Sequence, residues 1–491
     1  MRDADVFTIK NLNITEIDLM ENAAKAFCKL FIKKYPNQNL KISIFCGQGN
    51  NGGDGLAIAR LLNRADYKNI NVYLIQFSNK ESDCYQKKLK RLKKIKIPIT
   101  FIAKPEELGE ISPEIIIDGI LGSGLNQPLK GDFEKLVKLL NDLDAKVISI
   151  DVPTGFNSEK EIATKYNGIK ASFVISFQRP KINFFFPESV VAMEQFKVVD
   201  IGLDENFIQS RESDWYLTTK KDIQNLIKIR KNFSHKGTYG HALIVAGNTT
   251  TMGAALLAAN ACLHSGAGLT TVCLPESGLI ALNTALPEAM VLQRNKISLT
   301  KDLLDYTAFA IGPGLGIMNE NKLWLEKIIN IQKPLVIDAD ALNILSKNKS
   351  LLKKLAPNTI LTPHIKEFER LFGKQKNWWE SVQTARLKAQ TLKVIVILKN
   401  QYTFICLPTG EIFINSTGNS AMASGGMGDV LTGIIVALLA QNYPPAEAAK
   451  LGVYLHGKAG DELSKKFYTV TASQVAEQIP KTIKKILAER I

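Results

Sequence analysis

Short apolar runs that alternate with helical stretches limit the fold of this chain more than any other feature of its sequence. In the first half, residues 41–46, 71–77, 115–118 and 147–151 are mostly β-branched or aromatic, and helical patterns lie between them. Strands that are joined by helices in this order form a parallel sheet with helices on both faces. We therefore predict a doubly wound α/β fold for the first half.

A second α/β series follows a polar stretch at residues 200–214, where the alternation lapses. One hydrophobic core rarely serves more than about 250–300 residues, so a chain of 491 residues is expected to form two domains. We place these domains at residues 1–208 and 215–491. The runs that predict strands in the second domain are 242–246, 269–273, 308–311, 335–338, 359–361 and 394–398, and helices are expected at 252–264 and 428–440.

The charge of the chain has two possible explanations. Lys and Arg number 62 against 47 Asp and Glu, which gives a net charge of +15. The densest basic segment, residues 87–96, carries Leu89, Leu92 and Ile95 at helical spacing, so we expect its lysines to face water. Aromatic residues, which a surface that stacks nucleic-acid bases would need, do not interleave with these cations. We therefore favour a solvated basic face over a nucleic-acid partner.

The sequence also bears on the compartment. No apolar run approaches the ~20 residues that cross a bilayer, and the N-terminal segment MRDAD lacks the apolar core of a signal peptide. The six cysteines are dispersed, and the five histidines show no metal-ligand spacing with them. We expect no membrane association, no disulfide framework and a reducing, cytoplasmic location.

A glycine-rich loop follows the first predicted strand. Residues 47–55 read GQGNNGGDG, with five glycines around Asn50, Asn51 and Asp54. Glycines allow backbone N–H groups to approach a phosphate, and the N-terminus of the next helix favours an anion. The pattern G-x-G-x-x-G is by itself a weak dinucleotide signal, and a tight turn with positive φ is the alternative. The number of glycines favours a binding loop.

Two more predicted strands end in aspartate. Asp118 precedes the loop 119–128, and Asp151 precedes the sequence VPTG at 152–155. Open α/β sheets bind their ligands at the carboxyl ends of their strands. A single aspartate at this position often caps the next helix, but three such loops at one edge of a sheet indicate a binding site.

Four motifs in the first half resemble the NAD(P)H-hydrate epimerase family: LMENA (19–23), GQGNNGGDG, DGILGSGLNQPLKG (118–131) and DVPTG (151–155). This family interconverts the R and S forms of NAD(P)HX, the hydrate of NAD(P)H, on a Rossmann-like domain. The resemblance implies a potassium ion at Asn51, Asp118 and Thr154, whose oxygens suit a hard cation. Asp151 matches a substrate-contacting aspartate, and we expect it to move a proton near the hydrated ring carbon. The residues implied to bind NAD(P)HX are Asn50, Asn51, Gly52, Gly53, Asp54, Gly122, Ser123, Gly124, Leu125, Asn126, Gln127, Pro128 and Asp151.

The second half carries another glycine run at the start of a predicted helix. Residues 424–433 read SGGMGDVLTG, which places Asp429 beside an anion hole of backbone N–H groups. A carboxylate there can accept the proton of a hydroxyl that attacks phosphorus. Helix capping is the alternative role for Asp429, but the glycines before the helix cost stability unless they serve a function.

Five motifs in the second half resemble the NAD(P)H-hydrate dehydratase family, which has a ribokinase-like fold: HKGTYG (235–240), GPGLG (312–316), DADALN (338–343), TPHIKEF (362–368) and GGMGD (425–429). Members remove water from S-NAD(P)HX at the expense of a nucleotide phosphate, with Mg²⁺ at the phosphates; bacterial members use ADP and release AMP and phosphate. The resemblance implies that Asp429 is the base that prepares the ring hydroxyl for phosphorylation. The residues implied to contact the hydrate are Ala254, Gly316, His364 and Asp429, and those implied to hold the adenine nucleotide are Lys399, Asn400, Gln401, Tyr402, Thr403 and Gly428. Asn400 stands where the family commonly has glycine.

Two other functions compete with this one. Many kinases share the ribokinase-like fold, so the second domain could phosphorylate a vitamin or a sugar. Domains that resemble the first half occur in RNA-associated scaffolds, and a net charge of +15 is compatible with that role. The epimerase and dehydratase together account for both halves, with NADHX, NADPHX and ADP as substrates, no nucleic-acid partner, and a homo-oligomer as relatives suggest.

Overall fold

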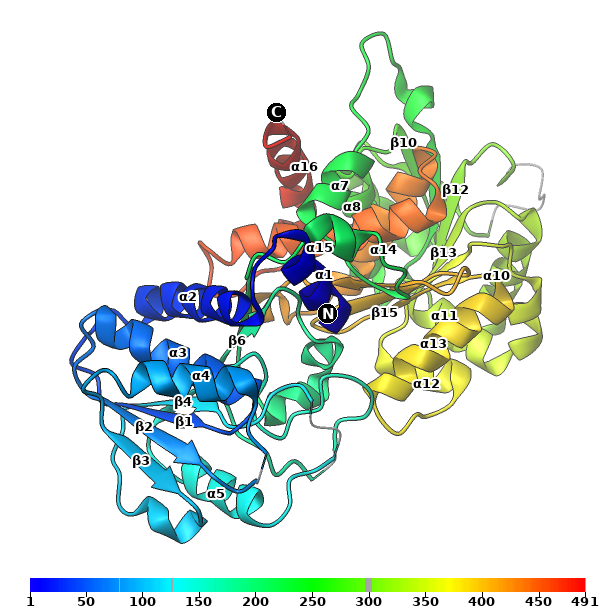
Figure 1. The fold of residues 1–491 in the computed structure, drawn as a ribbon. Helices are drawn as coiled ribbons and strands as arrows, with labels where there is room; N and C mark the ends of the chain where they lie inside the picture. Colours follow the sequence, from blue (N-terminus) through cyan, green and yellow to red (C-terminus); the bar gives the residue numbers. More distant parts are fainter. Residues whose placement is uncertain (79, 125–126, 164, 296–302, 491) are drawn as a thin grey trace. The chain divides into compact units, whose positions relative to one another are not determined.

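The computed structural model describes residues 1–78, 80–124, 127–163, 165–295 and 303–490. The chain divides into two compact units, Met1–Glu212 and Ser213–Ile491 (Figure 1). Each unit has its own β-sheet and its own cluster of buried apolar side chains. Each unit can therefore position a site of its own.

The described part of the N-terminal unit contains a parallel sheet with the strand order β3-β2-β1-β4-β5-β6-β7. The chain starts in the middle, adds strands on one side and then crosses to the other, as in doubly wound folds. The register pairs Cys46 with Gly119 and Asp118 with Ser149, so the ends of β1, β4 and β5 lie along one edge. The predicted parallel sheet is confirmed, although β3, β6 and β7 were not predicted. The strands are β1 (Ile42–Cys46), β2 (Ile70–Ile75), β3 (Ile99–Ile102), β4 (Ile115–Gly119), β5 (Lys146–Ile150), β6 (Phe173–Phe177) and β7 (Phe196–Val199).

Helices cover both faces of this sheet. In Figure 1, α2, α3 and α4 lie together on one face, and α5 lies on the other. Thr15 and Asp18 form a capping box that starts α2, which buries Ala24, Phe27 and Phe31 at helical spacing against the sheet. The helices are α1 (Arg2–Asn11), α2 (Glu16–Lys34), α3 (Asn50–Arg64), α4 (Asp83–Leu92), α5 (Asp132–Asn141) and α6 (Glu205–Gln209), with 3₁₀ turns at Pro105–Leu108, Ile182–Phe185 and Pro187–Val191.

The lysine-rich helix departs from its prediction in two ways. α4 ends at Leu92, so Ile95 lies beyond the helix. Lys88 does not face water: its side chain is 1% exposed, and its ammonium group lies 2.6 Å from the Glu21 carboxylate. Arg60 of α3 contacts the same carboxylate. The expectation that every lysine of this segment is solvated is therefore wrong, because α4 packs on α2 and α3 and Glu21 offers Lys88 a charged partner.

Replacing Glu21 by glutamine is expected to destabilise the N-terminal unit. The substitution leaves two poorly hydrated cations without their anion, at a cost of about 2 kcal/mol given the partial exposure of the carboxylate. Burial raises the pKa of Glu21, but the hydrogen bonds from Lys88 and Arg60 outweigh burial and leave it lowered. The stabilisation that Glu21 provides is therefore present above the ordinary glutamate pKa. It is lost as the pH falls through the lower pKa that Glu21 has in the folded protein. Hydrogen exchange of the β1 and β4 amides would measure both the loss of stability and its dependence on pH. Equal protection of these amides in the wild type and the variant would contradict the prediction.

The described part of the C-terminal unit contains a mixed sheet with the order β11-β10-β9-β12-β13-β14-β15-β16-β17-β8. The pairs β15–β16 and β16–β17 are antiparallel, and the others are parallel. Six of these strands were predicted, whereas β8, β11, β16 and β17 were not. The strands are β8 (Trp215–Leu217), β9 (His241–Val245), β10 (Leu269–Leu274), β11 (Met290–Gln293), β12 (Ala308–Ile311), β13 (Leu335–Ile337), β14 (Ile360–Leu361), β15 (Ile395–Leu398), β16 (Thr403–Cys406) and β17 (Ile412–Asn415).

Two groups of helices pack on this sheet. α8, α14, α15 and α16 contact one another, and α10 to α13 form a separate group in Figure 1. α14 contacts both the sheet and α8, so residues 430–440 are buried all round and read as one apolar run. The helices are α7 (Lys220–Leu226), α8 (Met252–His264), α9 (Leu279–Ala285), α10 (Asn319–Ile331), α11 (Ala339–Lys347), α12 (Ile365–Phe372), α13 (Trp378–Leu392), α14 (Met427–Ala440), α15 (Pro445–Leu463) and α16 (Ala472–Ala488), with 3₁₀ turns at Lys236–Tyr239, Glu276–Gly278, Lys349–Lys354 and Ser420–Met422. Within the described ranges, no helix is both long and apolar enough to cross a bilayer.

Candidate active sites

A cavity of about 570 Å³ opens at the carboxyl ends of the strands of the N-terminal unit. Asn50, Asp54, Ser123 and Asp151, which sequence reasoning selected from three separate loops, all line it. Side chains from α1, α2 and the segments after β6 and β7 complete the wall. The strand order thus gathers residues that are about 100 positions apart in the chain into one pocket.

The glycine-rich loop is the start of a helix. α3 begins at Asn50, and Gly49 caps it without a side-chain hydrogen bond, which leaves its first N–H groups available to an anion. None of the five glycines has a positive φ, so the alternative of a tight left-handed turn does not apply. A Cβ on Gly52 would lie 1.7 Å from the carbonyl oxygen of Gly47. Glycine is therefore needed because α3 starts so close to the end of β1.

The carboxylate of Asp151 is held in place by three donors. Its Oδ1 accepts hydrogen bonds from Lys181 Nζ at 2.8 Å, from the backbone N–H of Phe177 at 3.0 Å and from Ser176 Oγ at 3.1 Å. These three donors all contact Oδ1 and hold the carboxyl group in one orientation, and Oδ2 is outside that set. Asp151 also adopts a φ of 62°, which is rare for residues other than glycine and is found most often at functional sites.

Asn51, Asp118 and Thr154 lie together beside this cavity. Asp118 is fully buried, and its oxygens accept hydrogen bonds from Thr154 Oγ1 at 2.6 Å, Thr154 N at 2.9 Å and Ser149 Oγ at 2.8 Å. Asn51 Nδ2 donates to the carbonyl oxygen of Leu121, which also lies 3.2 Å from Thr154 Oγ1. Burial raises the pKa of Asp118, and the hydrogen bonds from Thr154 and Ser149 oppose it. Within the described chain, the groups that donate hydrogen bonds to Asp118 are all neutral, so a bound cation would suit this buried carboxyl group.

The other described residues predicted for this unit do not line the cavity: some lie beside the site, and some lie in the loop that follows β4. Gly53 lies in the first turn of α3, and a Cβ on Gly122 would lie 3.3 Å from Asn51 Cβ, which places both beside the site. Gly124, Gln127 and Pro128 belong to the loop that follows β4 and are not among the residues that line the cavity. Leu125 and Asn126 lie outside the described residues. Sequence reasoning missed Lys181 because β6, which leads to it, had not been recognised.

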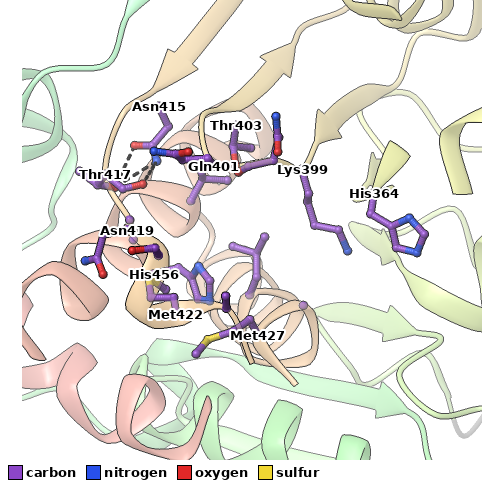
Figure 2. Close-up of a pocket in the computed structure, with 18 of the residues that line it drawn as sticks. His364, Lys399, Gln401, Thr403, Asn415, Thr417, Asn419, Met422, Met427 and His456 are labelled. Carbon is purple, nitrogen blue, oxygen red and sulfur yellow. Dashed lines mark hydrogen bonds between the residues drawn. The ribbon is translucent and has the colours of Figure 1, made fainter. Parts of the chain in front are cut away.

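A cavity of about 690 Å³ lies in the C-terminal unit and is shown in Figure 2. Five of the residues predicted to hold a nucleotide line it: Lys399, Asn400, Gln401, Thr403 and Gly428. Tyr402 is half-buried and is not among the lining residues. Asn400 has no positive φ, so the loop does not require the glycine that the family commonly has there.

Lys399, which lines this cavity, forms an ion pair with the buried Asp338. Its Nζ lies 2.9 Å from Asp338 Oδ1, and Thr432 Oγ1 donates to Asp338 Oδ2 at 2.7 Å. Burial lowers the pKa of Lys399, but the charges of Asp338 and Glu367 outweigh burial and leave it raised. The ammonium group therefore stays charged. A Cβ on Gly428 would lie 3.3 Å from Lys399 Nζ, so this cation lies beside the first turn of α14.

Asp429 lies in the first turn of α14 but does not cap it. The N-cap is Gly426, which has a φ of 86° and no side-chain hydrogen bond. A Cβ on Gly426 would lie 2.4 Å from Leu257 Cδ1, so glycine is required at this position. Burial and the charge of Asp338 raise the pKa of Asp429 to about 7, against the opposing charge of Lys399. This carboxyl group is thus tuned to accept a proton near neutral pH.

The residues predicted to contact the hydrate are spread over neighbouring loops. His364 lines the cavity and also caps α12, because its Nδ1 accepts from Lys366 N at 3.1 Å. That bond leaves the proton of the neutral imidazole on Nε2, and burial with the charge of Lys399 lowers its pKa. The backbone N–H of Gly316 donates to Asp340 Oδ2 at 2.8 Å. A Cβ on Gly314 would lie 2.9 Å from the side chain of Ala254, so α8 and the loop after β12 are in contact.

Several polar residues that line this cavity were missed. Asn415, Thr417, Asn419 and His456 lie opposite Lys399 and His364 in Figure 2, and Asn415 and Thr417 are hydrogen-bonded to each other at 3.0 Å. His456 is half-buried, its Nε2 is buried without a hydrogen-bond partner, and burial lowers its pKa to about 4. It lies inside α15, where the sequence shows only an amphipathic helix. Within the described ranges, no group of three or more His, Cys, Asp or Glu residues could hold a metal ion.

The two folds and their cavities define a two-domain α/β protein with a candidate active site in each unit. A family model described as YjeF-related protein N-terminus matches residues 16–183, and a model described as NAD(P)H-hydrate dehydratase matches residues 242–481. The bifunctional NAD(P)H-hydrate repair enzyme Nnr of Coxiella burnetii is 33% identical over 91% of this chain and 90% of its own, and that of Escherichia coli K12 is 33% identical over 93% and 87%. The chain belongs to the family of bifunctional NAD(P)H-hydrate repair enzymes.

A solved structure agrees with this assignment. A ribokinase-like superfamily protein from Enterococcus faecalis V583 is 31% identical, with a TM-score of 0.52, over 56% of this chain and 98% of its own. The predicted ribokinase-like fold of the C-terminal unit and the predicted family are therefore confirmed.

Proposed function

We propose that residues 1–208 interconvert the R and S forms of NADHX and NADPHX, and that residues 215–491 dehydrate the S form with ADP. The cavity of the N-terminal unit supports the first activity, because Asp151 lies on its wall beside an uncapped helix N-terminus that suits the phosphates of a dinucleotide. The basic surface favours such polyanions without a nucleic-acid partner. The six cysteines, all reduced and buried, accord with a cytoplasmic location.

Potassium would be held by Asn51, Asp118 and Thr154. Their oxygens are the hard donors that such a cation prefers, and the buried Asp118 carboxyl group would gain the positive neighbour that its neutral partners do not supply. A bound ion would fix the loops that follow β4 and β5 and so position Ser123 and Asp151. Phosphate binding by the substrate would gain from the same positive charge.

Replacing Asp118 by asparagine is expected to weaken potassium binding about tenfold or more, because the charged ligand is lost. Epimerisation would be measured against KCl, with choline chloride holding the ionic strength constant, and KCl should raise the thermal transition of the wild type more than that of the variant. Asp132→Asn, an exposed residue at the start of α5, is the matched control. An unchanged half-saturating KCl concentration in Asp118→Asn would refute the potassium site.

The dehydratase proposal is carried by Asp429. Water adds to the dihydropyridine ring so that the hydroxyl group lies on the carbon bonded to the ring nitrogen, and hydroxide is a poor leaving group. Asp429 would take the proton of this hydroxyl as its oxygen attacks the β-phosphorus of ADP, which breaks the bond to AMP. The ring nitrogen then expels phosphate, and loss of a proton from the neighbouring carbon restores NAD(P)H. Phosphorylation thereby turns the hydroxyl into a good leaving group.

Residues that line the C-terminal cavity, next to Asp429 in the first turn of α14, would hold the nucleotide. Lys399 and the open N–H groups of α14 face the phosphates, and Mg²⁺ that enters with ADP would neutralise further charge. The free Nε2 of His456 would bond to the nucleotide from the opposite wall. Ala254, Gly316 and His364 lie on the loops that would face the hydrate.

The nucleotide choice can be tested with S-NADHX and Mg²⁺ and either ADP or ATP. We expect one AMP and one phosphate for each NADH formed from ADP. NADH formation from ATP alone, with ADP inert, would refute the proposed donor. Phosphorylation of a vitamin or sugar without NADH formation would favour the kinase alternative.

A further inference from the structure

The cavity of the N-terminal unit contains a second carboxyl group, which the proposed role of Asp151 leaves unused. Asp54 lies in the second turn of α3 and lines the cavity. Its Oδ1 is buried and has no hydrogen-bond partner. A buried carboxylate without donors is unfavourable, whereas a protonated carboxyl group can donate its own hydrogen to a ligand. The geometry thus favours a protonated carboxyl group on the cavity wall.

The charges around Asp54 act in the same direction. Burial and the charge of Asp151 raise its pKa well above the ordinary value, and Asp5 of α1 adds to the rise. Lys88 of α4 opposes them, but its ammonium group is already paired with Glu21. Lys181, which lines the cavity, is paired with Asp151. Within the described chain, no hydrogen-bond donor reaches Asp54 Oδ1.

The two carboxyl groups on this wall therefore differ in their surroundings. Asp151 accepts three hydrogen bonds, one of them from the ammonium group of Lys181. Asp54 Oδ1 accepts none. Two carboxyl groups whose environments separate their proton affinities are the usual arrangement for an acid and a base in one site.

We infer that Asp54 is the acid and Asp151 the base of the N-terminal site, an assignment that rests on the proposed epimerase function. Asp54 protonates the ring hydroxyl, the C–O bond breaks as the ring nitrogen forms a C=N bond, and one water leaves. A second water attacks the planar carbon from the opposite face, and Asp151 accepts its proton. Water in the cavity returns that proton from Asp151 to Asp54, so each inversion exchanges one oxygen with solvent and consumes nothing.

The test uses the full chain with purified R-hydrate in ¹⁸O-water, without ADP. The wild type should gain one ¹⁸O for each inversion, with a rate that falls as the pH rises and Asp54 loses its proton. Asp54→Asn should slow inversion about 100-fold or more and lose that dependence on pH. Asp54→Glu, which keeps an ionisable acid, should retain more activity than Asp54→Asn.

Two controls keep the outcomes distinct. Asp132→Asn should behave as the wild type, and Asp54→Asn should unfold at about the same temperature, because a neutral amide replaces a protonated carboxyl group of nearly the same size. Inversion by Asp54→Asn at the wild-type rate, or inversion that retains ¹⁶O, would overturn the inference while the epimerase function stands. A wild type that does not epimerise the hydrate would overturn the proposed function as well.

Discussion

Asp429→Asn is expected to lose ADP-dependent dehydration by a factor of about 100 to 10,000, which is the usual contribution of a general base. Asparagine keeps the size of the side chain but cannot accept the proton of the ring hydroxyl. Asp429 lies in the first turn of α14 without capping it, so helix stability should change little. The measurement is NADH formation from S-NADHX under saturating ADP and Mg²⁺.

The dependence on pH gives this prediction a second readout. Burial and Asp338 raise the pKa of Asp429 to about 7, and the base works only when it is deprotonated. The rate for the free enzyme should therefore rise with pH through about 7 and then level off, and Asp429→Asn should lack this limb. Asp305→Asn, an exposed residue before β12, is the control. Full activity of Asp429→Asn would remove Asp429 from the mechanism.

Lys399→Met is expected to destabilise the C-terminal unit by about 3 kcal/mol, because it leaves the buried Asp338 carboxylate without its cation. The Asp338 side chain is 2% exposed, so water cannot replace the lost partner. All four tryptophans (Trp215, Trp324, Trp378 and Trp379) lie in the C-terminal unit. Urea unfolding followed by tryptophan fluorescence therefore reports on this unit in the full chain.

A double variant separates the ion pair from the packing of the lysine. Asp338→Asn combined with Lys399→Met removes both charges and should cost less than the sum of the single substitutions. Lys366→Met, an exposed lysine of α12, is the control. Costs that add without coupling would mean that the pair contributes nothing to stability beyond its separate side chains.

Much of the fold follows from local sequence patterns. The strands that line the sites, such as β1, β4 and β15, are fully buried and read as continuous apolar runs. Four of the missed strands differ: β3 and β7 are only partly buried, and β16 and β17 form antiparallel additions whose pairing depends on distant partners, whereas β6 is buried and was missed all the same. Local patterns say little about such edge and long-range pairings.

The site residues also divide into those that local sequence patterns indicate and those that only the tertiary structure reveals. Asp118, Asp151 and Asp429 follow strands or glycine runs, so their positions along the chain indicate their role. Lys181 and His456 have no such local signal, and only the tertiary structure brings them to a cavity wall. The partner of Lys88 was also unpredictable, because Glu21 lies on another helix.

The central claim is that one chain performs both steps, and purified R-NADHX tests it most directly. With ADP, Mg²⁺ and potassium, the wild type should convert all of this isomer to NADH, which its absorbance reports. Asp151→Asn should leave the R form unused, Asp429→Asn should accumulate the S form, and a mixture of the two variants should restore NADH, because their sites lie in separate units. Failure of the wild type to form NADH from R-NADHX faster than the uncatalysed reaction would contradict the account.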